Sequence, residues 1–298
     1  MPDASADTTP DAGPLAGLLS VLDLRHEASA AGQDVFTGDS QPRPWGRVFG
    51  GQVLAQSLVA AARTVPDGRT AHSMHGYFLR PGDPETPITF TVERLRDGRS
   101  FSARRVQAAQ HGAPILSMIA SFQGSDEGLD HGQPMPEVPD PESLPTTADL
   151  IGHLDDPVAR HWARERPVDV RHVEGAIFLS ARGERTDAQA VWMRAVGALP
   201  DDDALHRAVM AYASDYTMLE PVLRRHGVPW AHPGLKAASL DHAMWWHRPA
   251  RADEWLLFVQ SSPSASGARG LGQGLLFARN GALVATVAQE GMVRTSRG

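Results

Sequence analysis

The chain has 298 residues, of which 42% are apolar and 21% are charged, and its formal net charge is −7. This composition is typical of a folded globular protein, and the length allows one large domain or two of ordinary size. The sequence contains no cysteine, which excludes disulfides, thiolate metal sites and a cysteine nucleophile. The negative charge, together with the lack of a basic stripe interleaved with aromatic residues, argues against nucleic acid as a partner.

No apolar run approaches the about 20 residues that a membrane helix requires. Residues 1–14 are acidic and contain proline, whereas a signal peptide has a basic segment followed by an apolar one. We therefore expect a tail at 1–14, no membrane span and a cytoplasmic location.

The first half of the chain has the pattern of helices followed by antiparallel strands. A short helix is expected at 15–24, and apolar residues at helical spacing after Gly50-Gly51-Gln52 predict a second helix that ends near Val65. An aromatic strand is expected at 75–81. Further strands, separated by turns at Asp97-Gly98 and His111-Gly112, are predicted over 88–95, 101–110 and 114–122.

The second half, from residue 161, repeats this order after a segment, 126–160, whose Pro, Asp, Gly and His content is typical of a linker. Strands are expected at 168–173 and 190–195. Apolar residues from Met218 to Leu223 predict a helix that follows Asp215 and stops at Gly227. Further strands, with breaks at Ser262-Pro263 and Asn280-Gly281, are predicted over 243–249, 255–260, 268–278 and 283–289.

An internal repeat relates the two halves. His-Gly-Tyr-Phe-Leu-Arg-Pro at 75–81 matches Ala-Met-Trp-Trp-His-Arg-Pro at 243–249, so that Arg80 and Arg248 lie 168 positions apart. A helix followed by antiparallel strands, occurring twice, predicts an α+β fold of two equivalent units. We expect these units at 1–125 and 161–298, each with a long curved sheet wrapped around one helix.

Six motifs in these two units resemble those of the acyl-CoA thioesterase II family, the double-hotdog thioesterases. Together they cover most of the chain and are specific as a set. They are Arg47-Val48-Phe49-Gly50-Gly51-Gln52, Tyr77-Phe78-Leu79-Arg80-Pro81-Gly82, Asp97-Gly98-Arg99-Ser100-Phe101-Ser102-Ala103-Arg104, Tyr212-Ala213-Ser214-Asp215, Asp241-His242-Ala243-Met244-Trp245-Trp246-His247-Arg248-Pro249 and Gln289-Glu290-Gly291.

The resemblance implies an enzyme that hydrolyses fatty acyl-CoA to a fatty acid and CoA, with neither metal nor organic cofactor. It identifies Asp215 as the general base and Ser239 and Gln289 as the residues that orient the attacking water. Serine stands where the family commonly has threonine, which keeps the hydroxyl and loses a methyl group. We expect Asp215 to lie near a helix start and to stay ionised, with no covalent acyl-enzyme. Family habit also implies a homo-oligomer, a dimer or tetramer.

The residues alone leave other interpretations open. An aspartate at a helix start is more often a cap than a base, and Asp241 is a rival to Asp215 because it shares a strand face with Ser239. The neighbouring pair Asp241 and His242 is the one feature that would suit a hotdog enoyl-CoA hydratase, although adjacent strand residues point apart. A non-catalytic acyl-CoA-binding module is the third reading.

Three further features of the sequence concern the division of the two units, the shape of the sheet and the arginines at the strand ends. The first unit has Gly50-Gly51-Gln52 where an acid would match Asp215, which predicts one catalytic and one supporting half. Glycines within 267–274 lack nucleotide-binding spacing and predict bulges or close approaches on a curved sheet. Arg80 and Arg248 would suit CoA phosphates or pair with carboxylates at strand ends.

Overall fold

The computed structural model describes residues 13–30, 33–181 and 185–295, so that 1–12 of the predicted tail lie outside the described residues. These described segments form one large antiparallel sheet of 13 strands and a small number of helices. The predicted α+β class is confirmed. None of the helices in these three ranges is long and apolar enough to cross a membrane.

The first half contains two helices and six strands. They are α1 (Pro14–Leu22), β1 (Arg25–Ala30), β2 (Gln33–Gly38), α2 (Gly50–Ala62), β3 (Thr70–Phe78), β4 (Ile88–Asp97), β5 (Phe101–Gln110) and β6 (Ala113–Gln123). The predicted helices and the four later strands are confirmed within a few residues. β1 and β2 have no counterpart in the prediction. The side chains of β1 are largely exposed, and the inward positions of β2 are Asp34, Phe36 and Gly38, so neither strand has the apolar alternation of a half-buried strand.

The second half has more helical segments. They are η1 (Pro141–Ser143), α3 (Thr147–Ile151), α4 (Pro157–Arg160), η2 (His161–Glu165), β7 (Val168–His172), β8 (Ala188–Ala195), α5 (Asp203–Ser214), α6 (Glu220–His226), β9 (Leu235–Ser239), β10 (Asp241–Trp246), β11 (Leu256–Ser266), β12 (Arg269–Ala278) and β13 (Leu283–Thr295). The helix predicted to stop at Gly227 is α6, and Gly227 caps it with a left-handed φ of 67°.

Two predictions for the second half are wrong. The expected break at Ser262-Pro263 does not end a strand, because β11 absorbs the proline in an irregularity between Ser261 and Ser264 and continues to Ser266. Helix α5 is absent from the prediction. Local signals for it are present, since the side chain of Asp202 caps its N-terminus and Leu205, Ala208, Val209 and Tyr212 are at helical spacing, but the only helix predicted in this region follows Asp215.

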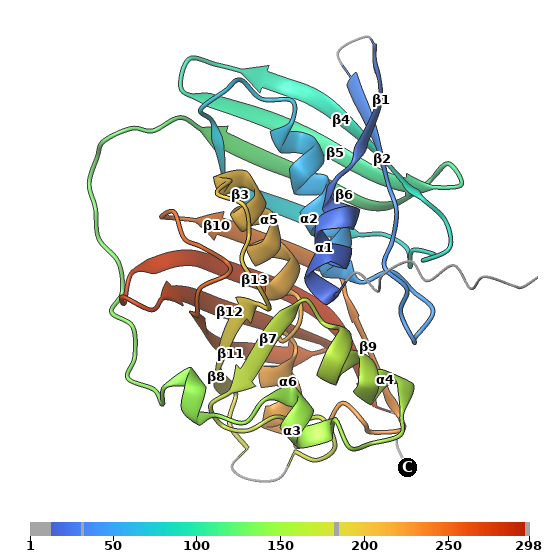
Figure 1. Ribbon diagram of the computed structural model, residues 1–298, viewed down its shortest axis with the longest axis vertical. Coiled ribbons are helices and arrows are strands. Elements are labelled where there is room, and N and C mark those ends of the chain that lie inside the picture. The colour runs from blue at the N-terminus through green and yellow to red at the C-terminus, as the bar shows by residue number, and fades with distance from the viewer. Residues whose placement is uncertain (1–12, 31–32, 182–184, 296–298) are drawn as a thin grey trace, which may run out of the picture.

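The two halves have the same strand order. The sheet runs β1-β2-β4-β5-β6-β3 in the first half and continues as β10-β13-β12-β11-β8-β7 in the second, which is the same series reversed. Antiparallel pairing of β3 with β10, with Met74 opposite Met244, joins them into one sheet. Figure 1 shows the two halves one above the other, with α2 and α5 side by side between them.

Each half of the sheet wraps around a helix. Helix α2 packs on β3, β4, β5 and β6, and helix α6 packs on β8, β11 and β12. Glycines on β12 permit this contact, because a Cβ at Gly272 would lie 2.2 Å from the carbonyl oxygen of Met218 and a Cβ at Gly270 would lie 2.6 Å from Val222. The expectation of close backbone approaches in this glycine-rich strand is therefore confirmed.

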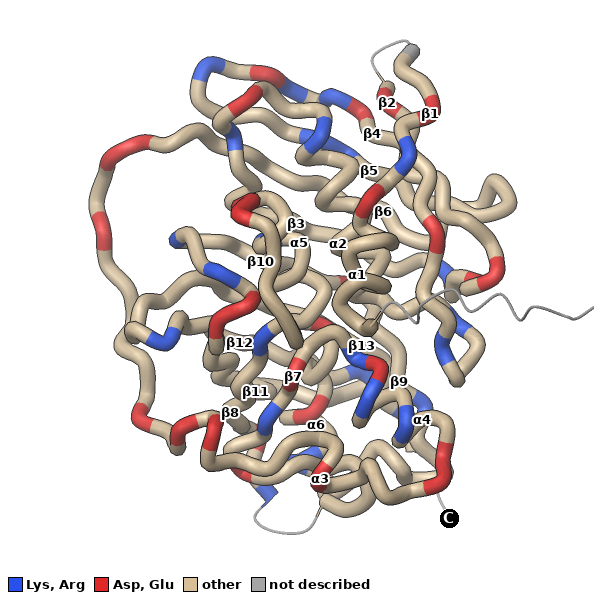
Figure 2. Tube along the Cα trace, viewed as in Figure 1, with Lys and Arg blue, Asp and Glu red and all other residues tan. Residues whose placement is uncertain are grey.

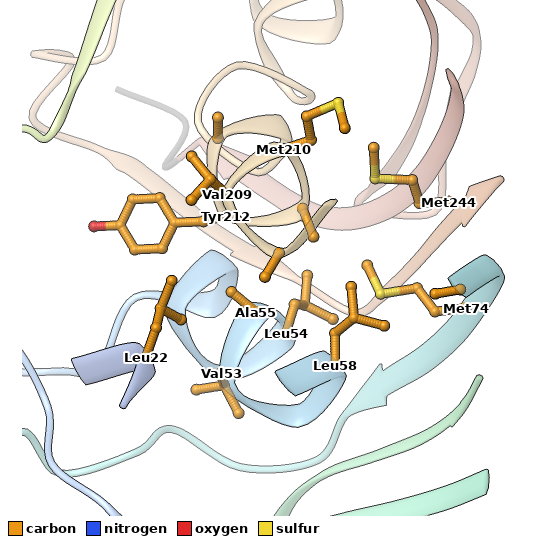
Figure 3. Close-up of a cluster of buried hydrophobic side chains, with 14 of the residues drawn as sticks. Leu22, Val53, Leu54, Ala55, Leu58, Met74, Val209, Met210, Tyr212 and Met244 are labelled. Atoms are coloured by element: carbon orange, nitrogen blue, oxygen red, sulfur yellow. The ribbon is translucent and has the colours of Figure 1, made fainter. Parts of the chain in front are cut away.

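The main core lies where α2 meets α5. Figure 3 shows Leu54 and Leu58 of α2 and Met210 of α5 in one cluster, with Met74 of β3 and Met244 of β10 near each other at its side. All these side chains are buried. The same contact that buries the apolar surface holds the N-terminus of α2 against the C-terminus of α5, which is where the candidate site lies.

The segment 126–160 has no helix or strand before η1, and its later part is folded. Ile151 of α3 and Ala159 of α4 are buried against Phe178. Earlier in the segment, Asp130 pairs with Arg248. The charged residues of this segment are acidic up to Arg160, whereas acidic and basic residues are interspersed along both halves (Figure 2).

Candidate active site

The structure brings Asp215, Ser239 and Gln289 together from three separate elements. Asp215 follows the last residue of α5, Ser239 ends β9, and Gln289 lies within β13. The Ser239 hydroxyl donates to Asp215 Oδ1 at 3.0 Å. The Gln289 amide nitrogen donates to the same carboxylate oxygen at 2.9 Å and to Ser239 Oγ at 2.9 Å. The arrangement is a closed triangle of polar groups around one carboxylate oxygen.

Strand pairing places two members of this triangle. β9 pairs with β13 in a register that sets Ser239 opposite Gly291, two residues from Gln289. The N–H of the next residue, Leu240, donates to the Glu290 carbonyl at 2.9 Å, and this bond continues the pairing with β13 from β9 to β10. This pairing brings Ser239 within hydrogen-bond distance of the Gln289 side chain.

The expectation that Asp215 lies at a helix start is wrong. Asp215 is the C-cap of α5, with φ −75° and ψ −8°, and α6 begins five residues later at Glu220. The helix N-terminus beside it belongs to α2 of the other half, where the N–H of Gly51 donates to Asp215 Oδ2 at 2.8 Å. The first half thus supplies the backbone donor, and the second half supplies the carboxylate.

The glycines of the Gly50-Gly51 pair make this approach sterically feasible. A Cβ at Gly50 would lie 2.7 Å from Asp215 Oδ2, and a Cβ at Gly51 would lie 2.4 Å from the backbone oxygen of Tyr212. Both distances are too short for any side chain. Glycine is therefore required here for the close contact between α2 and the end of α5.

Burial raises the pKa of Asp215, although the nearby His242 and the hydrogen bonds from Gln289, Ser239 and Gly51 oppose this effect. A raised pKa moves a carboxylate toward the range in which it accepts a proton near neutral pH. Asp215 and Ser239 retain partial exposure, whereas Gln289 is 1% exposed behind them. Within the triangle, Asp215 and Ser239 are therefore the members that solvent can reach.

Asp241 takes no part in the triangle. Its carboxylate accepts a hydrogen bond from the backbone N–H of Glu290 at 2.7 Å, which ties the start of β10 to β13. Its neighbour His242 points the other way and is 1% exposed. The two side chains therefore face opposite sides of the sheet, as adjacent strand residues do.

Two members of the site are not identified by the sequence reasoning. His242 contacts Gln289, but its partners lie 47 and 28 residues away in the chain, and no local spacing reveals them. Tyr216 stacks on Phe49 at 4.8 Å between ring centroids, beside Gly50 and Asp215. The Gly50-Gly51 pair at the start of α2 is the one sequence signal for the contact between the halves.

Comparison with known proteins identifies the family. The family profile described as acyl-CoA thioesterase matches residues 161–292, and that described as acyl-CoA thioesterase N-terminal domain matches residues 41–123. The chain is 42% identical over 274 residues to human acyl-coenzyme A thioesterase 8, covering 88% of this chain and 85% of that protein. The chain belongs to the acyl-CoA thioesterase family.

Solved structures agree with this assignment. The acyl-CoA thioesterase II TesB2 from Mycobacterium marinum is 43% identical and has a TM-score of 0.76, covering 94% of this chain and 99% of that one. A protein with a hot dog fold from Alicyclobacillus acidocaldarius has a TM-score of 0.74 at 20% identity, which shows the fold alone. This member of the acyl-CoA thioesterase family is a double hotdog, as the motifs predict.

The strand-end arginines of this thioesterase family member bind within the chain. Arg248 pairs with Asp130 and donates to the Leu283 carbonyl at 2.8 Å. Arg80 donates to the Pro114 carbonyl at 2.8 Å, the equivalent contact in the first half. Both arginines therefore fasten the end of a central strand to the neighbouring hairpin.

Proposed function

We propose that this protein hydrolyses the thioester of fatty acyl-CoA to a free fatty acid and CoA, and that Asp215 is the general base. The observation that carries the proposal is the convergence of Asp215, Ser239 and Gln289 on one carboxylate oxygen beside the N-terminus of α2. The names of its relatives, which are acyl-CoA thioesterases, support the same substrate class.

In the proposed reaction, Ser239 and Gln289 hold a water beside Asp215, which removes a proton as the water oxygen attacks the thioester carbonyl. The carbonyl oxygen gains negative charge, and the first turn of α2 provides a positive helix end at this position. The tetrahedral intermediate then breaks its C–S bond and expels the CoA thiolate, which takes the proton held by Asp215 and so regenerates the base. The scheme needs no covalent acyl-enzyme, metal ion or organic cofactor.

The hydratase alternative finds less support in the geometry. An Asp–His pair would have to act on one substrate carbon, yet Asp241 bonds to the Glu290 backbone and His242 is buried behind Gln289. The alternative of a non-catalytic binding module does not account for the Asp215 carboxylate, which is kept partly buried and accepts hydrogen bonds from three donors.

The experiment is a thiol-release assay on acyl-CoAs of increasing chain length. Since the chain has no cysteine, every thiol that appears comes from CoA. The proposal expects thiol release from saturated acyl-CoAs, with a chain-length optimum that measures the acyl channel. Binding without thiol release at any length, or hydration of a trans-2-enoyl-CoA without thiol release, would exclude thioester hydrolysis.

Three further expectations from the sequence belong with this proposal. We propose that the units 1–125 and 161–298 are equivalent hotdog repeats, that the protein acts in the cytoplasm, and that it forms a homo-oligomer. Exposed apolar side chains on neighbouring central strands, Tyr77 at 63% and Ile119 at 50%, support assembly of several copies through the outer face of the sheet. Light scattering tests the oligomeric state, since a monomer mass at micromolar concentration would contradict a homo-oligomer.

A further inference from the structure

His242 is a buried titratable side chain that the proposed reaction does not use. It lies on β10 directly behind the site and is 1% exposed. Its Nδ1 is 2.5 Å from Gln289 Oε1, and its Nε2 is 3.1 Å from Ser214 Oγ. The imidazole therefore bridges the amide of Gln289 and the last residue of α5.

The hydrogen-bond pattern determines which ring nitrogen carries the proton. The Gln289 amide nitrogen donates to Asp215 and Ser239, so its carbonyl oxygen faces His242 and requires a donor there. Nδ1 must therefore be protonated. In a neutral ring Nε2 is then an acceptor, and it competes with the Ala211 carbonyl, 2.9 Å from Ser214 Oγ, for the one hydroxyl proton of Ser214. Without the Nδ1 proton, two acceptors would face each other at hydrogen-bond distance.

Loss of this donor would favour rotation of the amide by half a turn. The Gln289 oxygen would then lie beside Asp215 Oδ1, and two acceptors would meet within the site itself. A carboxylate that has lost its amide donor and faces an oxygen instead no longer holds water in the same geometry. Displacements of about 1 Å in such a group cost on the order of 100-fold in rate.

The repeat provides an internal comparison. Met74 lies 168 residues before His242 and occupies the same place on β3, with Ala120 of β6 opposite it. Both residues are fully buried. The half without a catalytic carboxylate thus fills this position with an apolar pair, and the half with Asp215 fills it with His242 and Gln289. Packing alone does not require a histidine here.

We infer that His242 is a positioning residue, which fixes the orientation of the Gln289 amide and through it the water site of Asp215. This inference rests on the proposed function, because it concerns the same site. It predicts a specific tautomer, with the proton on Nδ1, and a specific chemical requirement, a donor directed at Gln289 Oε1.

Two substitutions of His242 separate these requirements. Asparagine places its amide nitrogen near the position of Nδ1 and keeps the donor to Gln289, whereas glutamine reaches toward Ser214 and lacks that donor. We expect His242→Asn to retain most of the wild-type kcat. We expect His242→Gln to lower kcat on the order of 100-fold with KM changed by no more than about twofold.

Equal loss in both variants, or loss in neither, would overturn the inference, because a merely structural histidine does not distinguish the two amides. Asp215→Asn is measured alongside. If that variant keeps wild-type activity, the proposed function fails, and this result is distinct from failure of the His242 pair. Melting temperatures of both His242 variants show whether either has lost its fold.

A second measurement needs no variant. The ¹⁵N shifts of the histidine rings in the wild-type protein report the tautomer of each imidazole, and His242→Asn assigns the resonance by its disappearance. If the asparagine variant does not fold, selective labelling and proximity to Ser214 protons assign it. A protonated Nδ1 with an unprotonated Nε2 is the expected result, and the opposite neutral tautomer would overturn the inference.

Discussion

Asp215 illustrates how one residue acquires its properties from distant parts of the chain. Its carboxylate accepts hydrogen bonds from Ser239, Gln289 and the N–H of Gly51, which lie 24, 74 and 164 residues away. The residue types could be inferred from the motifs. The backbone donor could not, because it depends on how α2 of the first half meets α5 of the second.

The pH dependence of the reaction should follow the ionisation of Asp215. A general base must be deprotonated, so kcat/KM should rise with pH through the pKa of Asp215 and level off above it. Because burial raises this pKa, the acid limb should have its midpoint above the 3.8 of an ordinary aspartate. The profile is measured by thiol release within the pH range where the protein stays folded. A midpoint at or below 3.8 would contradict this.

Ser239 should contribute through its hydroxyl and not through its size. Ser239→Ala removes one donor to Asp215 and should lower kcat by about fivefold, the value of a hydrogen bond of roughly 1 kcal/mol. Ser239→Thr keeps the hydroxyl and should stay within about threefold of wild type. Equal activity of the alanine and wild-type proteins would show that the hydroxyl does not orient the water.

At the scale of elements, hairpins are the most predictable part of this fold. Strands β4 to β6 alternate buried and exposed residues and are separated by short turns, so local pattern predicts them well. The prediction does not include helix α5, although a capping aspartate and apolar residues at helical spacing mark it locally; what local pattern does not provide is how the helix is packed. Its residues are buried on several sides by α2 and β3, and the Arg207 side chain bonds to the Ala71 carbonyl 136 residues away. Contacts of this kind are not encoded by local spacing.

The contact between α2 and α5 should be sensitive to any side chain at Gly51. Gly51→Ala would place a Cβ 2.4 Å from the Tyr212 carbonyl oxygen and against the Phe49 ring, so α2 must move away. We expect a loss of about 1–3 kcal/mol in the free energy of unfolding and a lower kcat, since the N–H bond to Asp215 lengthens. Gly128→Ala, with open space around it, is the matched control. Similar effects of the two substitutions would contradict this account.

At the scale of the whole molecule, the two halves are parts of one structure. The β3–β10 pairing makes the sheet continuous, the core spans α2 and α5, and the site draws on both halves. The repeat of 168 residues in the sequence predicts two units, but not that they share a sheet and a site. We therefore expect both halves to unfold together.

Calorimetry tests this expectation. The wild type should unfold in one transition, and Met244→Ala, which removes a fully buried side chain opposite Met74, should lower stability by about 2–5 kcal/mol without dividing the transition. Two separate transitions, in either protein, would show that each half folds independently of the other.

The central claim is that Asp215, and not Asp241, activates water. Thiol release from acyl-CoA by Asp215→Asn, compared with Asp241→Asn and the wild type, tests this most directly. Asparagine keeps the size of the side chain and removes the base, so Asp215→Asn should lose on the order of 10²–10⁴-fold in kcat. Asp241→Asn, whose native carboxylate bonds to a backbone N–H outside the site, should stay near wild type. Activity that survives in Asp215→Asn and disappears in Asp241→Asn would contradict the account.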